Sequence, residues 1–220
     1  MSDTEQKIKI KGKEFRYTPQ RLDRETDIAI DANIAKSNLL LFNSIAKSYN
    51  FKFVLFFGTL LGAIREQNFI KNDTDIDVVS KGEEELLNMI PALQGEGFLF
   101  IRYYAGEKRV LYSFLRQGVY IDVDIVRNAG KSKYYLAGAK IPSSFVDDLK
   151  VVDFIGESFF VPQEYEKIFI MLYGKDWRIP QNKAAYFPLI LRRDYMQILI
   201  HIIPKKFRNF VKTLLGLNKK

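Results

Sequence analysis

Three aspartates at alternate positions, Asp73, Asp75 and Asp77, lead into an apolar stretch of strand length. Because successive side chains of a β-strand point to opposite faces, Asp75 and Asp77 project from one face while Ile76 turns into the core. Two carboxylates held this close repel each other unless a cation lies between them. Hard oxygen ligands suit Mg²⁺, which binds one or two carboxylates and leaves its other positions to water and substrate phosphates.

A second acidic strand repeats this alternation further along the chain. Asp122 and Asp124 share one face of a strand expected at residues 119–126. If the two acidic strands are neighbours in one sheet, three or four carboxylates converge, as in sites where metal ions support in-line displacement at phosphorus. Aspartate is disfavoured in β-strands, so four such residues need an explanation. The alternative is that each pair belongs to the polar face of a half-exposed strand.

A Gly-Thr pair, Gly58-Thr59, follows an apolar run at residues 51–57 that is typical of a strand buried on both faces. The pair opens a turn into a short helix. Glycine allows a phosphate to approach the backbone, and the N–H groups at the start of a helix favour an anion. A lone Gly-Thr is usually just a turn, and it indicates a site here only because an acidic strand follows it.

The segments around these residues alternate between strand and helix patterns, which predicts an α/β or α+β domain built on one layered sheet. Apolar spacing predicts a helix from Asp27 to about Asn50 and another from Glu83 to Leu93, which Pro91 must end or kink. A third helix is expected at residues 164–174. The expected strands are an edge strand at 7–11, the buried run at 51–57, and strands or hairpins at 76–80, 97–103, 109–115, 119–126 and 155–162.

Composition sets the limits of the chemistry. The 220 residues, of which 47% are hydrophobic, suffice for one substantial domain. The absence of cysteine excludes disulfides, cysteine-bound zinc, iron–sulfur clusters and thiol nucleophiles. The single histidine, His201, excludes sites that need two imidazoles.

The basic charge of the chain belongs to its C-terminal end. The formal net charge is +8, and residues 191–220 hold eight basic residues against one acid, a net of +7. After Pro204 the apolar and basic residues segregate onto different helical faces, which predicts an amphipathic helix that lies on an anionic membrane surface. The alternative is a helix docked on the protein itself or on a partner chain. Nucleic acid is not expected as a partner, because basic and aromatic residues do not share one surface.

We therefore expect a polar N-terminal arm at residues 1–26, a catalytic domain at 27–190 and a basic amphipathic tail at 191–220. The polar N-terminus lacks the apolar segment of a signal peptide, and no run reaches 18 apolar residues. The expected location is cytoplasmic, peripheral on the inner face of the cell membrane.

Three segments in order resemble the LicD family, the phosphocholine-transferase-like branch of the nucleotidyltransferase superfamily that includes the fukutin-related proteins. They are GTLLGAIREQNFIKNDTDIDVV from Gly58, GVYIDVDIV from Gly118 and GESFFVPQEYEKIFIMLYGKDWRIP from Gly156. The resemblance covers roughly residues 35–182. It implies a nucleotidyltransferase-like mixed sheet flanked by helices.

The resemblance also implies the reaction and its metal. A phospho-substituent would pass from a CDP-linked donor to a hydroxyl of a cell-surface glycan precursor, and CMP would leave. Mg²⁺, with Mn²⁺ as the alternative, would be held by Asp75, Asp77 and an acid of the later strand. Asp122 aligns best as that acid, whereas Asp124 stands where the family more often has an aromatic residue. Asp124 is therefore an additional ligand, or the third acid itself if the alignment is off by two residues.

For the donor, the resemblance implies that Gly58 and Thr59 face its phosphates and that Arg65, in a position the family keeps basic, clamps them. The alternative for Arg65 is an ion pair with a nearby acid. The loop that usually reads Ile-Pro-Trp-Asp in the family is here Ile70 to Asp73, with Lys71 in place of proline. Lys71 would contact a phosphate or a more anionic donor, or it is simply solvated. Asp73, the last residue of this loop, is also expected to bind substrate.

Two other functions remain open from the residues alone. A nucleotidyltransferase of the same fold would move a nucleoside monophosphate from a nucleoside triphosphate to a small molecule, protein or RNA. A non-catalytic, membrane-bound adaptor would retain the acids only as surface charge.

Overall fold

The computed structural model describes residues 5–20 and 29–180. The chain divides into two compact units, Met1–Tyr165 and Glu166–Lys220. The two expected domain boundaries, at 26/27 and 190/191, lie outside the described residues, and so does the expected tail at 191–220 with His201.

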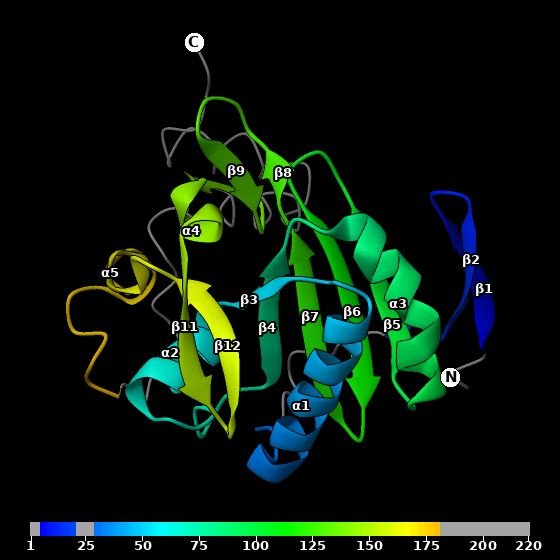
Figure 1. Ribbon diagram of the computed structural model, residues 1–220, viewed down its shortest axis with the longest axis horizontal. Coiled ribbons are helices and arrows are strands. Elements are labelled where there is room, and N and C mark those ends of the chain that lie inside the picture. Colours follow the sequence, from blue (N-terminus) through cyan, green and yellow to red (C-terminus); the bar gives the residue numbers. More distant parts are fainter. Residues whose placement is uncertain (1–4, 21–28, 181–220) are drawn as a thin grey trace, which may run out of the picture. The chain divides into compact units, whose positions relative to one another are not determined.

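A five-stranded mixed sheet forms the centre of the first unit (Figure 1). Its strands, in spatial order, are β3 (Phe53–Leu55), β4 (Asp75–Ser80), β7 (Val119–Ile125), β6 (Val110–Arg116) and β5 (Leu99–Ala105). Strands β4 and β7 are parallel, and every other neighbouring pair is antiparallel. The predicted mixed sheet with its two acidic strands is thus confirmed, and those strands are direct neighbours.

Two helices, α1 (Ala32–Ser48) and α3 (Glu83–Gly95), pack on one face of this sheet and against each other (Figure 1). The core beneath them is rich in aromatic rings. The ring of Phe42 on α1 contacts those of Phe53, Phe98 and Phe114, with centroids 5.4–6.5 Å apart. This packing leaves the opposite face of the sheet for the acidic side chains.

Helix α1 begins later than the expected start at Asp27. Residues 29–31 are not helical, and the Asp31 carboxylate accepts hydrogen bonds from the backbone N–H groups of Asn33 and Ile34, at 2.8 and 3.1 Å. Asp31 is therefore the N-cap, which satisfies donors that the first helical turn leaves without partners. The preceding residue, Ile30, donates its backbone N–H to the carbonyl oxygen of Asp73 at 2.8 Å. This bond ties the start of α1 to the loop before β4.

Pro91 does not end helix α3, which was one of the two effects, an end or a kink, that the sequence predicted for it. The helix continues to Gly95 with Pro91 in its interior. Proline costs a backbone hydrogen bond in this position, but side chains on both sides of it are buried against the sheet. These are Leu86, Leu87, Met89, Ile90 and Leu93. Tertiary burial of this apolar stripe offsets the local cost.

The apolar run at 51–57 forms a shorter strand than expected. Only Phe53–Leu55 are in β3, and Phe57 is already the first residue of helix α2 (Phe57–Arg65). Phe57 has a φ of 45°, a left-handed conformation that a bulky side chain rarely adopts. The chain therefore turns abruptly from β3 into α2, directly before the Gly-Thr pair.

Smaller elements complete the first unit, and several of them were not predicted. The hairpin of β1 (Gln6–Ile10) and β2 (Lys13–Tyr17) precedes Thr18, whose N–H donates to Phe100 of edge strand β5. The other edge, β3, packs against β12. The remaining elements are β8 (Arg127–Asn128), β9 (Lys133–Leu136), β10 (Ala139–Pro142), α4 (Ser144–Asp147), β11 (Leu149–Phe154) and β12 (Glu157–Pro162).

Helix α5 (Tyr165–Tyr173) is the predicted third helix. Gly174, with a φ of 87°, follows its end as a left-handed cap. Within the second unit, the ring of Phe169 packs on that of Trp177 with centroids 4.6 Å apart. Across the described stretches 5–20 and 29–180, no helix has the length and apolar character needed to cross a membrane.

Candidate active site

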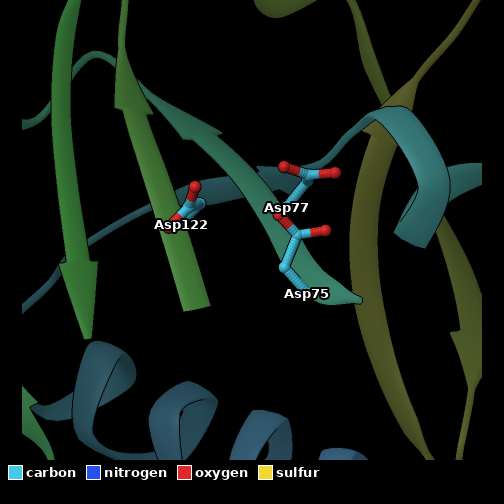
Figure 2. Close-up of side chains that lie close together, drawn as sticks. All are labelled: Asp75, Asp77 and Asp122. Carbon is cyan, nitrogen blue, oxygen red and sulfur yellow. The ribbon is translucent and has the colours of Figure 1, made fainter. Parts of the chain in front are cut away.

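The two acidic strands bring three carboxylates together. Strands β4 and β7 pair so that Asp77 lies directly opposite Asp122. Asp75, Asp77 and Asp122 each offer a carboxylate oxygen, and these three oxygens lie within 4.8 Å of one another. Figure 2 shows the three side chains side by side across the two strands. We refer to these residues as the acidic triad.

The acidic triad follows directly from strand geometry. Asp75 and Asp77 are two residues apart on β4 and share a face, while Ile76 between them is fully buried on the other face. Adjacent strands of a sheet are about 4.8 Å apart. A parallel pair with these two residues in register therefore has to bring the Asp77 and Asp122 side chains into contact range.

Asp77 carries the strongest electrostatic perturbation of the acidic triad. Burial raises the pKa of its carboxyl well above the usual value, and the nearby carboxylates, Asp75 foremost, raise that pKa further. Its backbone N–H donates to Oγ1 of Thr59 at 2.9 Å, which holds this part of β4 against helix α2. Without a cation, ionisation of Asp77 is therefore unfavourable in the folded protein.

Asp122 has one engaged oxygen and one without a partner. Its side chain is buried, with 6% of the residue exposed. Oδ2 accepts a hydrogen bond from Nη2 of Arg102 at 2.6 Å, whereas Oδ1 is buried without a hydrogen-bond partner. A buried carboxylate oxygen is costly to leave unsatisfied, so Oδ1 points to a ligand that the polypeptide itself does not supply.

Asp124 is not part of the acidic triad. Its two oxygens accept hydrogen bonds from Nε and Nη2 of Arg109 at 3.0 and 3.2 Å, a bidentate ion pair. Burial raises the pKa of Asp124, and Arg109 opposes this shift. Of the two acids that the sequence leaves as alternatives for the third position, the geometry brings Asp122 to the others.

Gly58 and Thr59 lie in the first turn of α2, beside the acids. Thr59 is fully buried, and its hydroxyl oxygen accepts the hydrogen bond from the Asp77 backbone N–H. A Cβ atom added to Gly58 would lie 2.5 Å from Oδ2 of Asp73, so any side chain there would force the Asp73 carboxylate to move. Both residues thus shape the surroundings of the acids, and their contact with donor phosphates stays a prediction.

Asp73 closes the loop that precedes β4. Its Oδ1 accepts from the N–H of Thr74 at 3.2 Å, and its Oδ2 is buried without a hydrogen-bond partner. Burial raises the pKa of Asp73 to about 6, an effect that the Thr74 N–H opposes and the Glu66 carboxylate increases. Lys71, on the same loop, is exposed. Contacts of Asp73 and Lys71 with a substrate stay predictions.

Arg65 lies in the last turn of α2 and forms an ion pair with Glu66, its neighbour in sequence, at 2.5 Å. This is the alternative that the sequence left open for the arginine. The Arg65 side chain is partly buried, and its contact with donor phosphates stays a prediction.

Sequence reasoning missed the two arginines that bind the acids. Arg102 on β5 lies two strands away from Asp122, and Arg109 immediately precedes β6. The order β7-β6-β5 had to be known before either pair could be inferred. The run of three strands separated by short turns was the available signal, since sequential hairpins usually pair with their neighbours.

The acids provide the oxygen ligands that Mg²⁺ prefers. Within the stretches that the structure describes, the acidic triad is the one cluster of three or more side chains suited to hold a metal ion. The buried Oδ1 of Asp122 and the repulsion at Asp77 both fit such an ion.

Comparison with known proteins yields one family match. The sequence model of a family described as LicD/FKTN/FKRP, nucleotidyltransferase domain, matches residues 50–164. This range runs from the start of β3 past β12 and contains the acidic triad, the Gly-Thr pair and both arginines that bind the acids. No curated protein matches the chain.

Proposed function

Because the chain belongs to the LicD/FKTN/FKRP family of nucleotidyltransferase domains, we propose that it is a Mg²⁺-dependent phosphotransferase that uses a CDP-activated donor. The family makes it a transferase with a phosphotransferase-like function. The metal, the CDP-linked donor and the acceptor, a hydroxyl of a cell-surface glycan precursor, are our proposal. The transferred group would be choline phosphate or a related polyol or sugar phosphate.

The acidic triad is the observation that supports this reaction best. Three carboxylate oxygens within 4.8 Å of one another form a set of hard ligands, and Oδ1 of Asp122 is buried without a hydrogen-bond partner. Asp75, Asp77 and Asp122 would hold Mg²⁺, or Mn²⁺ in its place, and the ion would supply charge stabilisation to phosphoryl oxygens.

The proposed transfer is a displacement at the distal phosphorus of the donor. The oxygen of the acceptor hydroxyl forms a bond to that phosphorus, and the bond from the phosphorus to the bridging oxygen breaks. CMP leaves with the electron pair of this bond. The hydroxyl proton passes to a base, for which Asp122 and Asp124 are our candidates. Both oxygens of Asp124 bind Arg109, and Oδ2 of Asp122 binds Arg102 while its Oδ1 would hold the metal, so either acid would have to exchange a contact for the proton.

The acceptor would be assembled at the cytoplasmic leaflet, where residues 191–220 would bind the protein to the membrane surface. This proposal rests on the net charge of +7 in that segment and on its amphipathic pattern. The segment itself lies outside the described residues.

The test is nucleotide release by the full-length protein with Mg²⁺, offered a panel of CDP-alcohols and nucleoside triphosphates. Asp75→Asn and Asp77→Asn serve as site variants, and Asp153→Asn is the matched control. Asp153 is an exposed carboxylate on β11 that accepts a hydrogen bond from the Ser158 hydroxyl of the same hairpin at 2.8 Å. Each assay is repeated with a lipid-linked glycan acceptor.

The released nucleotide distinguishes the functions. CMP from one CDP-donor, lost in both site variants and retained in Asp153→Asn, is the expected result. Pyrophosphate from a nucleoside triphosphate would instead identify a nucleotidyltransferase. No release with the acceptor present, together with no Mg²⁺ binding, would identify the non-catalytic adaptor.

A further inference from the structure

Arg102 reaches Asp122 because edge strand β5 contains a bulge. Phe100 pairs with Phe114, but Arg102 pairs with Ser113, so Ile101 is an additional residue in β5. In a regular ladder, Arg102 would lie opposite Tyr112 and point to the face covered by α1 and α3. The bulge turns Arg102 to the face of the acids, and bulges of this kind re-aim side chains beside active sites.

The guanidinium of Arg102 is fixed at two points. Its Nε donates to Oγ of Ser113 at 2.8 Å, and its Nη2 donates to Oδ2 of Asp122 at 2.6 Å. Ser113 is fully buried and lies directly opposite Asp122 in the β6–β7 pair. Arg102 therefore spans β6 to reach β7, and its side chain is held in one orientation.

This arrangement makes the two oxygens of Asp122 unequal. Oδ2 is occupied by Arg102, and Oδ1 remains for a ligand at the acidic triad. The hydrogen-bonded oxygen keeps a lone pair, but the positive guanidinium beside it repels a cation, so a metal ion binds preferentially through the other oxygen. Mg²⁺ requires compact octahedral coordination, whereas Ca²⁺ takes six to eight oxygens and readily accepts both oxygens of one carboxylate.

We propose that Arg102 is a positioning residue that restricts Asp122 to a single metal-binding oxygen and so favours Mg²⁺ over Ca²⁺ at the acidic triad. The inference rests on the metal site of the proposed function. Arg102 would influence which ion binds by acting through Asp122, without contacting the ion.

The test compares the affinities of the metal-free, full-length protein for Mg²⁺ and Ca²⁺ by isothermal titration calorimetry. The measured quantity is the ratio of the Kd for Ca²⁺ to the Kd for Mg²⁺. Removing Arg102 also removes a positive charge, which strengthens the binding of both ions alike and cancels in this ratio. In Arg102→Met we expect the ratio to fall about tenfold, the order of effect seen when groups that orient metal ligands are removed.

Arg109→Met is the matched control. It removes an equal charge from the same face, but from Asp124, which lies outside the acidic triad. Both affinities should rise in this variant while the ratio stays within about twofold. Ser113→Ala retains all charges and removes one of the two anchors of Arg102, so its ratio should fall less than in Arg102→Met.

The outcomes separate this inference from the proposed function. An unchanged ratio in Arg102→Met, or an equal fall in Arg109→Met, overturns the positioning role and leaves the metal site intact. Wild-type protein that binds neither ion overturns both. If circular dichroism shows that Arg102→Met does not fold, Ser113→Ala and Arg102→Lys decide the question, and an unchanged ratio in both overturns the inference.

Discussion

Replacing Asp77 by asparagine should stabilise the metal-free protein. The substitution retains the shape of the side chain and removes one negative charge from the acidic triad. In the folded chain, burial and the neighbouring carboxylates raise the pKa of Asp77 well above its usual value. This shift means that the native state disfavours the ionised group, and the unfolded chain does not.

The size of the effect follows from the distances. Two unit charges 4.8 Å apart, the limit for oxygens of the acidic triad, repel by about 3 kcal/mol at an effective dielectric constant of about 20. Partial protonation of Asp77 and the Arg102 guanidinium beside Asp122 reduce this figure. We therefore expect Asp77→Asn to increase the free energy of unfolding by about 2 kcal/mol. For a protein of this size, that corresponds to a rise in Tm of about 4–8 °C.

The assay is thermal unfolding at pH 7.5, followed by circular dichroism in EDTA and then in excess MgCl₂. Mg²⁺ should raise the Tm of the wild type, because an ion that binds only the folded state stabilises it, and should have little effect on Asp77→Asn. Asp153→Asn, on the exposed hairpin, should match the wild type in both buffers. The reasoning would be refuted if Asp77→Asn had a lower Tm than the wild type in EDTA and if Mg²⁺ did not change the Tm of the wild type.

Four further results are expected. Because the pKa of Asp73 is raised to about 6 and that of Asp77 is also raised, the folded state binds more protons than the unfolded state above about pH 4. The unfolding free energy of the metal-free protein, from urea titrations, should therefore fall as the pH rises from about 4 to 6. Gly58→Ala places a Cβ 2.5 Å from Asp73 Oδ2 and should lower the free energy of unfolding, measured in urea, by about 1–3 kcal/mol. In a double-mutant cycle, Asp73→Ala should reduce this loss. Thr59→Val leaves the Asp77 N–H without its acceptor and should cost about 1–3 kcal/mol, whereas Thr59→Ser should cost less. Deletion of residues 191–220 should abolish co-sedimentation with anionic vesicles and spare CMP release from a soluble acceptor.

The convergence of the acids could be predicted from the sequence because it depends on local rules. Alternation along a strand places Asp75 and Asp77 on one face, and the same rule applies to Asp122 and Asp124. Which of the latter two joins the others depends on the register between β4 and β7. The observed register places Asp122, not Asp124, opposite Asp77. The alternation of side chains along one strand carries no information about this register.

The parts that could not be predicted depend on tertiary contacts. The bulge at Ile101 has no mark in the sequence, since an isoleucine in a regular strand looks the same. Strict alternation along β5 would place Arg102 on the other face of the sheet. Pro91 was expected to end or kink its helix, and it does not end the helix because burial of the residues around it offsets the local cost. The short strands β8, β9 and β10 were missed because each spans only two to four residues.

The parallel pairing of β4 with β7 also determines the stage of folding at which the acidic triad can form. Strands β5 and β6 lie between β4 and β7 in the sequence, and contacts between such distant segments form late because loop closure is entropically costly. The acidic triad is therefore absent from any partly folded chain in which β7 has not paired with β4. An ion that bridges the two strands would bind only after they have paired. It would act on the completed sheet, where it lowers the rate of unfolding.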